Sequence, residues 1–107
     1  MDFKSSETKS NLMRAFAGES QARNRYTIAA GQARAEKLYV IEAVFRFTAE
    51  QEKEHAEIFY KYLGEMAGEN IAIDGAYPVD ISKDAAVLLR MAQHNEYEEH
   101  DDVYQNF

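Results

Sequence analysis

The sequence predicts an all-α fold, a helix bundle of which three helices are present in these 107 residues. Apolar residues recur at alternating steps of three and four along three long segments, which is the period of one face of an α-helix. Glycine and proline interrupt this pattern between residues 64 and 78. We expect helices over about 5–35, 38–66 and 84–107, with a connection over about 67–83.

The first predicted helix starts near Ser5 and Ser6, where a hydroxyl group is available to cap the first turn and Glu7 supplies an acid. Small residues crowd this helix and allow a neighbouring helix to approach closely. Glu19 falls on the same face as the large apolar side chains, so we expect it to point inward. That face consists of Leu12, Phe16, Glu19, Arg23, Tyr26, Ala30 and Ala33.

The second predicted helix places a carboxylate and an imidazole one turn apart among apolar residues. Glu52 and His55 would be unsatisfied in a dry core unless they bound each other, a polar partner or a metal. The predicted inward face consists of Leu38, Ile41, Phe45, Thr48, Glu52, His55, Phe59, Tyr62 and Met66.

The third predicted helix follows a connection long enough to cross from one end of a bundle to the other. Asp80, Ser82 or Asp84 can cap its first turn. Acids again occupy inward positions, because the predicted face consists of Ala85, Leu89, Ala92, Glu96, Glu99 and Val103.

Composition narrows the classes of partner. Asp and Glu number 19 against 12 Lys and Arg, a formal charge of −7, which disfavours nucleic acid or an anionic membrane as a partner. Cysteine is absent, which excludes disulfides and thiolate ligands. No apolar run reaches the length of a membrane span, and the first residues lack the features of a signal peptide. We therefore expect a soluble, cytoplasmic protein.

The inward acids predict a metal centre. Divalent iron and manganese prefer carboxylate and imidazole ligands, and two such ions held close together need bridging carboxylates. Di-iron carboxylate bundles take one Glu from each of two helices and a Glu-x-x-His pair from each of the other two. Glu19, the pair Glu52 and His55, and the pair Glu96 and Glu99 supply three of these four contributions. A lone Glu-x-x-His is more often a solvated helix face, but acids on three inward faces together favour a bound cation.

Simpler roles are expected for other polar and aromatic residues. His94 and His100 lie off the third inward face, so we expect them to be exposed, although His100 could reach the site from its edge. Core packing is the default role for Tyr26 and Tyr104. A hydrogen bond to a ligating carboxylate is the more specific alternative.

Two stretches carry a family resemblance. Residues 15–26 (AFAGESQARNRY) and 49–56 (AEQEKEHA) resemble the first helical pair of rubrerythrins. Residues 96–99 (EYEE), with Tyr104 and Phe107, are similar to the start of that family's third helix. The resemblance spans nearly the whole chain.

This resemblance implies a ferritin-like four-helix bundle, of which residues 1–107 form a partial di-iron domain. It also implies two non-haem iron ions, with manganese as an alternative, and reduction of hydrogen peroxide to water. Electrons would come from a separate carrier protein. It implies that the iron ligands are Glu19, Glu52, His55, Glu96 and Glu99, and that Tyr26 and Tyr104 donate hydrogen bonds to them.

The sequence departs from the family pattern in two ways. It contains neither the fourth helix, with its second Glu-x-x-His, nor the cysteine-ligated rubredoxin-like domain. Either the chain is a fragment, or two copies form a homodimer in which each supplies Glu19 and the pair Glu52 and His55. A ferritin-like protein that binds and oxidises iron is one alternative function. A metal-free structural or interaction module is another.

Overall fold

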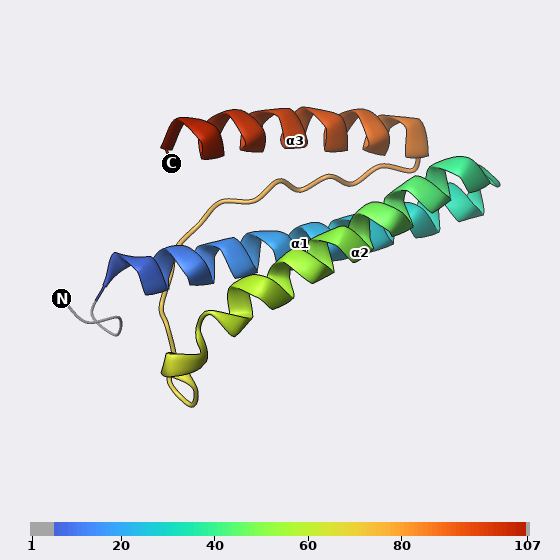
Figure 1. Ribbon diagram of the computed structural model, residues 1–107. Coiled ribbons are helices and arrows are strands. Elements are labelled where there is room, and N and C mark those ends of the chain that lie inside the picture. Colours follow the sequence, from blue (N-terminus) through green and yellow to red (C-terminus); the bar gives the residue numbers. More distant parts are fainter. Residues whose placement is uncertain (1–5, 107) are drawn as a thin grey trace.

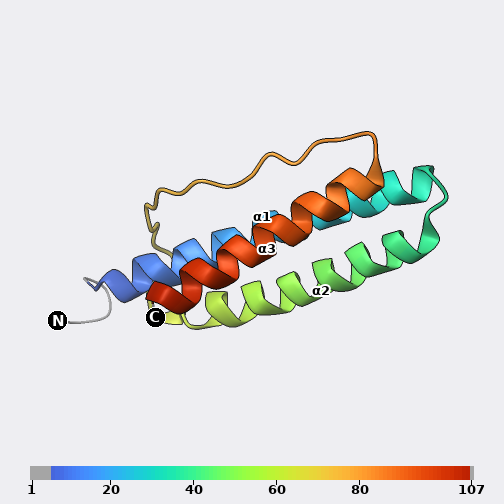
Figure 2. The same cartoon turned by 90° about the horizontal axis from the view of Figure 1, so that it is seen from above.

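The described chain consists of three long helices, one short 3-10 helix and a long crossover. The computed structural model describes residues 6–106, with side chains placed for residues 6–98. Helices α1 (Glu7–Ala35) and α2 (Tyr39–Lys61) form an antiparallel hairpin. The crossover then returns along the hairpin, so that α3 (Ala85–Asn106) runs parallel to α2 (Figures 1 and 2). The prediction of an all-α fold with three helices is confirmed.

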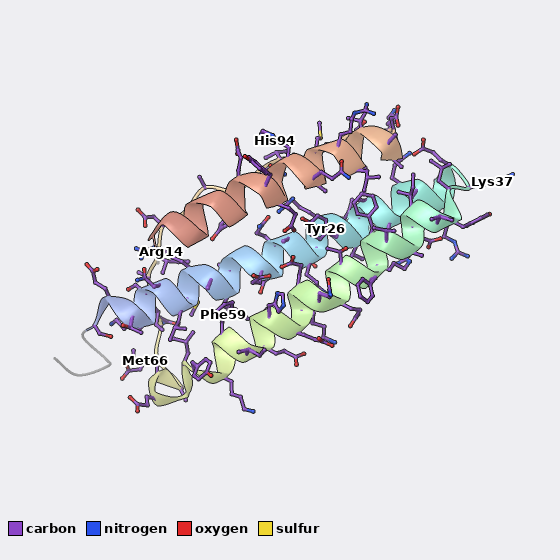
Figure 3. All side chains as sticks on the ribbon, turned by 45° about the horizontal axis from the view of Figure 1, so that its top comes forward. Arg14, Tyr26, Lys37, Phe59, Met66 and His94 are labelled. Carbon is purple, nitrogen blue, oxygen red and sulfur yellow. The ribbon has the colours of Figure 1, made fainter. Side chains whose placement is uncertain are left out.

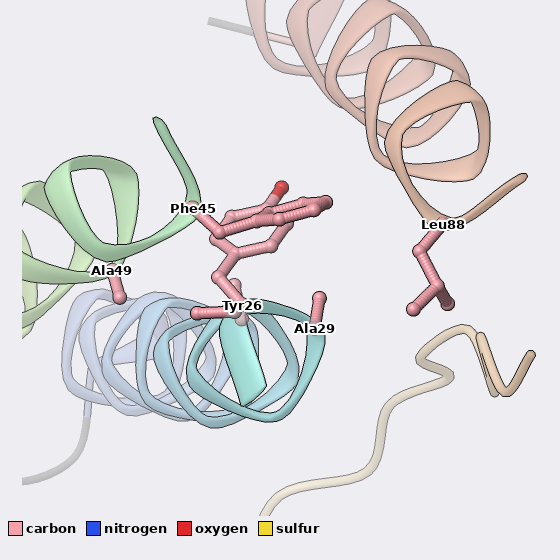
Figure 4. Packing of buried hydrophobic residues seen from close by; sticks show 7 residues of the cluster. Tyr26, Ala29, Phe45, Ala49 and Leu88 are labelled. Atoms are coloured by element: carbon pink, nitrogen blue, oxygen red, sulfur yellow. The ribbon is translucent and has the colours of Figure 1, made fainter. Parts of the chain in front are cut away.

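Small side chains hold α1 and α2 together. The buried residues of α1 recur at helical spacing: Ala22, Tyr26, Ala29, Ala30 and Ala33. On α2 they are Glu42, Phe45, Ala49 and Ala56. Methyl groups allow the two backbones to approach closely, and the larger rings fill the space that remains. The centroids of the Tyr26 and Phe45 rings lie 6.1 Å apart (Figure 4).

The turn between α1 and α2 contains no glycine. Lys37 adopts the left-handed conformation, with φ of 63°. Its N–H donates to the Arg34 carbonyl at 3.0 Å, and the N–H of Leu38 donates to the Ala33 carbonyl at 2.9 Å. These two bonds form a Schellman motif, which usually has glycine at the left-handed position. The turn is therefore formed by backbone geometry that sequence composition does not reveal.

The predicted inward face of α2 is partly wrong. Leu38 and Tyr62 are 38% and 66% exposed, whereas Glu42, which was not predicted to be inward, is 8% exposed. Helix α2 contacts α1 closely, so it buries a narrow strip that is rotated relative to the predicted face. Glu42 is accommodated there because Arg46 lies 2.8 Å and Arg34 3.6 Å from its carboxylate.

Helix α2 is also shorter than predicted. It ends at Lys61, and a 3-10 helix over Gly64–Met66 follows. The tighter turn places both Leu63 and Met66 in the core, at 6% and 5% exposure. Figure 3 shows Met66 at this end of the hairpin.

Helix α3 is held at its first turn by polar contacts. Asp84 caps the helix, its Oδ1 accepting from the N–H of Ala86 at 2.9 Å. Glu36, at the end of α1, accepts from the N–H of Ala85 at 2.8 Å. Leu88 adds apolar packing against the α1–α2 core (Figure 4). Among the described residues, no helix is long and apolar enough to cross a lipid bilayer.

Candidate metal centre

The α1–α2 hairpin brings together three of the predicted ligands. Glu19 extends from α1, and Glu52 and His55 lie one turn apart on α2. One ligand atom from each lies within 4.8 Å of the other two. His55 Nδ1 is 3.6 Å from Glu19 Oε2. No other described residues form such a group of three acids or histidines.

This group of donors fits a divalent iron or manganese ion. Two carboxylates and one imidazole match the ligand preferences of these ions, and oxygen and nitrogen donors converge from two adjacent helices. The Glu19 side chain is 16% exposed, and Glu52 is partly buried. His55 differs from the prediction of a core position, because its side chain is 55% exposed. Its imidazole lies at the rim of the site, where no described element covers it.

Glu96 lies outside this group and contacts a different residue. The hydroxyl of Tyr26 donates to Glu96 Oε1 at 2.7 Å, which links α1 to α3. Figure 3 shows Tyr26 between these two helices. The predicted core position of Glu96 is wrong for the described chain, since the residue is exposed. Helix α3 contacts α1 only sparsely, so water reaches the carboxylate from the uncovered side.

The remaining predicted site residues cannot be placed in this geometry. The side chains of Glu99, Tyr104 and His100 lie outside the described residues, so their roles stay predictions. His94, which was expected to be exposed, has a side chain that is 68% exposed and lies 3.2 Å from Glu98. Figure 3 shows it on the side of α3 away from the hairpin.

A pocket of about 590 Å³ lies beside Glu19. Its walls come from α1, α3, the crossover near Tyr77, and Phe59 of α2. Arg25 and Asn95 also line it. A small polar molecule can therefore approach the Glu19 end of the candidate metal centre through this pocket.

A polar link that the sequence pattern does not predict lies beside the site. Asp80 was considered only as a cap for α3, but its carboxylate contacts Arg25 of α1 and Asn95 of α3. No local motif predicts such a link, because the partners are 55 and 15 residues away along the chain.

Comparison with known proteins gives one consistent family. The rubrerythrin family model matches residues 10–107. The rubrerythrin of Clostridium perfringens is 44% identical over 105 residues, which cover 97% of this chain and 54% of the relative. The rubrerythrin of Porphyromonas gingivalis is 45% identical over 104 residues, which cover 97% of this chain and 50% of the relative. The rubrerythrin of Nitratidesulfovibrio vulgaris is 39% identical over 104 residues, which cover 97% of this chain and 53% of the relative. The chain thus spans about half the length of the curated relatives that it matches.

Proposed function

The chain belongs to the rubrerythrin family, and from that membership we propose that it forms part of the di-iron centre of a peroxidase. The reaction is the reduction of hydrogen peroxide to water, with electrons from a separate carrier protein. The observation that supports this proposal is the convergence of Glu19, Glu52 and His55 from two helices.

Each described residue has a definite part in this proposal. Glu19 and Glu52 hold metal from opposite helices, and His55 adds a nitrogen donor at the rim. When bound, two iron ions supply the two electrons that, with two protons, convert one hydrogen peroxide into two water molecules. Tyr26 orients the Glu96 carboxylate through its hydroxyl group. By family resemblance, Tyr104 has a corresponding role.

The pocket beside Glu19 gives the proposed substrate a route to the site. Hydrogen peroxide is small and forms hydrogen bonds readily, so a pocket lined by Arg25, Asn95 and the Tyr77 segment suits it. In the proposed reaction, the separate carrier protein supplies the two electrons.

We propose that a second copy of the chain supplies the remaining ligands. Helix α2 supports this choice, because it exposes apolar side chains at helical spacing on a strip adjoining the ligands: Val40, Val44, Phe47 and Ile58. A two-fold partner that covers this strip would bring a second Glu19 and a second pair Glu52 and His55 to the site. A monomer in solution that still holds two irons would refute this arrangement.

The first test measures metal binding with matched histidine variants. We expect anaerobic Fe²⁺ to raise the melting temperature of the chain, because an ion that binds only the folded state stabilises it by about 2.7 kcal/mol at 100 times its dissociation constant. His55→Ala should reduce this shift strongly. His94→Ala is the control, since it removes another exposed histidine that also contacts a glutamate.

The outcomes separate the proposed function from its alternatives. Rapid peroxide consumption per bound iron supports the peroxidase. Many irons per chain with slow turnover would support iron storage instead. A melting temperature that neither Fe²⁺ nor a chelator changes would support a metal-free structural module.

A further inference from the structure

Asp80 of the crossover joins α1 to α3. Its Oδ2 accepts a hydrogen bond from Asn95 Nδ2 at 2.6 Å and lies 3.4 Å from Arg25 Nη1. The side chains of Arg25 and Asp80 are each 17% exposed, so water screens this ion pair less than it screens a surface pair. One carboxylate therefore connects two helices that otherwise contact each other sparsely.

Arg25 is itself held on its other sides. Its Nε donates to Gln21 Oε1 at 2.6 Å, and Gln21 Nε2 donates to the Gly18 carbonyl at 2.7 Å. The guanidinium carbon lies 5.4 Å from the centroid of the Tyr26 ring, a distance typical of cation–π contact. Asp80 thus binds a cation whose position is fixed by α1.

The link through Asp80 runs beside the hydrogen bond between Tyr26 and Glu96. Arg25 directly precedes Tyr26, and Asn95 directly precedes Glu96. Adjacent residues of a helix are rigidly related, so a contact that fixes Asn95 also fixes the height and rotation of Glu96. We propose that Asp80 is a positioning residue that holds α3 in the register that presents Glu96, a predicted iron ligand, to Tyr26.

The crossover offers a matched control. Asp74 also pairs with an arginine of α1, at 3.4 Å from Arg14 Nη2, but the two side chains are 96% and 45% exposed. No described contact of Asp74 reaches α3. Asp74→Ala therefore removes the same type of ion pair from the same segment without removing a link to α3.

The test is the NMR signal of the Tyr26 hydroxyl proton in the metal-free full chain, assigned by its loss in Tyr26→Phe. A proton held by a carboxylate exchanges slowly with water while the hydrogen bond stays closed. We expect Asp80→Ala to accelerate this exchange about tenfold or to remove the signal. Asp74→Ala should leave the exchange rate unchanged. Asp80→Asn keeps an acceptor for Asn95, so the exchange in this variant should be slower than in Asp80→Ala.

A purely stabilising role gives a different result. Asp80→Ala would then lower the melting temperature but leave the Tyr26 signal of the folded protein as in the wild type, and this outcome would overturn the proposal. If Asp80→Ala does not fold, Asn95→Ala decides the question, because it removes the same link from α3 and leaves the Arg25 ion pair in place. An unchanged Tyr26 signal in Asn95→Ala would overturn the proposal equally.

The consequence for metal rests on the proposed function and is measured separately. Titration with Co²⁺ should show about tenfold weaker binding in Asp80→Ala, the effect expected when the support of a ligand is removed, and no change in Asp74→Ala. A wild-type chain that binds no Co²⁺ would contradict the proposed function. The metal-free NMR measurement would still decide the positioning role of Asp80.

Discussion

The α1–α2 hairpin and helix α3 are held in place by different interactions. The hairpin is packed through alanine methyl groups and the rings of Tyr26 and Phe45. Helix α3 buries fewer apolar residues, Ala85 and Leu88, and packs Leu89, Met91 and Ala92 partly buried against the core. Polar links fix it at its first turn, at Asn95 and at Glu96.

This difference places the predicted iron ligands in two parts of the molecule, a packed part and a part fixed by polar links. Apolar packing supplies most of the stability, whereas each hydrogen bond adds only about 1 kcal/mol but imposes direction. Glu19, Glu52 and His55 belong to the packed part, so their arrangement forms together with the hairpin. Glu96 belongs to the part fixed by polar links, and its position depends on a few specific contacts.

The largest expected effect comes from the packed part. Phe45 is 2% exposed, so Phe45→Ala should lower the free energy of unfolding by about 3–5 kcal/mol. Chemical denaturation followed by circular dichroism measures this loss. Ile28→Ala is the control, because Ile28 is 72% exposed on the same hairpin and should change stability by about 0.5 kcal/mol or less. Equal losses in the two variants would mean that the hairpin is not organised around Phe45.

A smaller effect is expected where α3 meets α1. Glu36→Ala removes the acceptor for the N–H of Ala85 and should destabilise the first turn of α3 by about 1 kcal/mol. Hydrogen exchange should accelerate at the amides of α3 and stay unchanged at the buried amides of α1 and α2. Faster exchange throughout the hairpin would contradict this separation of the two parts. Glu50→Ala, at an exposed position of α2, serves as the control.

The smallest effect is a gain in stability at the hairpin turn. Lys37 has φ of 63°, a conformation that costs a residue with a Cβ about 1–2 kcal/mol more than glycine. Lys37→Gly should raise the free energy of unfolding by about 0.5–1 kcal/mol, after allowance for the greater freedom of glycine in the unfolded chain. Thermal unfolding measures this gain in the free energy of unfolding. Arg34→Gly, within α1, should instead be destabilising, by about 1 kcal/mol through lower helix propensity and further through loss of the ion pair with Glu42.

The sequence predicted the packed part better than the part fixed by polar links. Helical periodicity placed Glu19 and Tyr26 on the inward face of α1 and Glu52 on the inward face of α2, because the local pattern determines which side of a helix is apolar. It could not predict the left-handed turn at Lys37, where glycine is usual. It also could not identify the role of Asp80, since partners far apart in sequence leave no periodic signal.

Exposure near the site was the least predictable property. The periodicity that marked Glu96 and His55 as inward describes a helix surrounded by neighbours. In the described chain, α3 and the outer side of α2 each lack one such neighbour, so these two residues reach water. The pattern placed the ligands Glu19 and Glu52 on facing sides of α1 and α2, but the number of covering helices decides whether a face is dry.

The alanine contact between α1 and α2 has a consequence for ion selection. Glu19 and Glu52 come from opposite sides of this contact, so the thickness of the methyl layer at Ala22, Ala49 and Ala56 sets how far apart their oxygens lie. An ion bound by both carboxylates must match that gap. Discrimination by ionic radius would then originate in side chains that carry no charge and touch no metal.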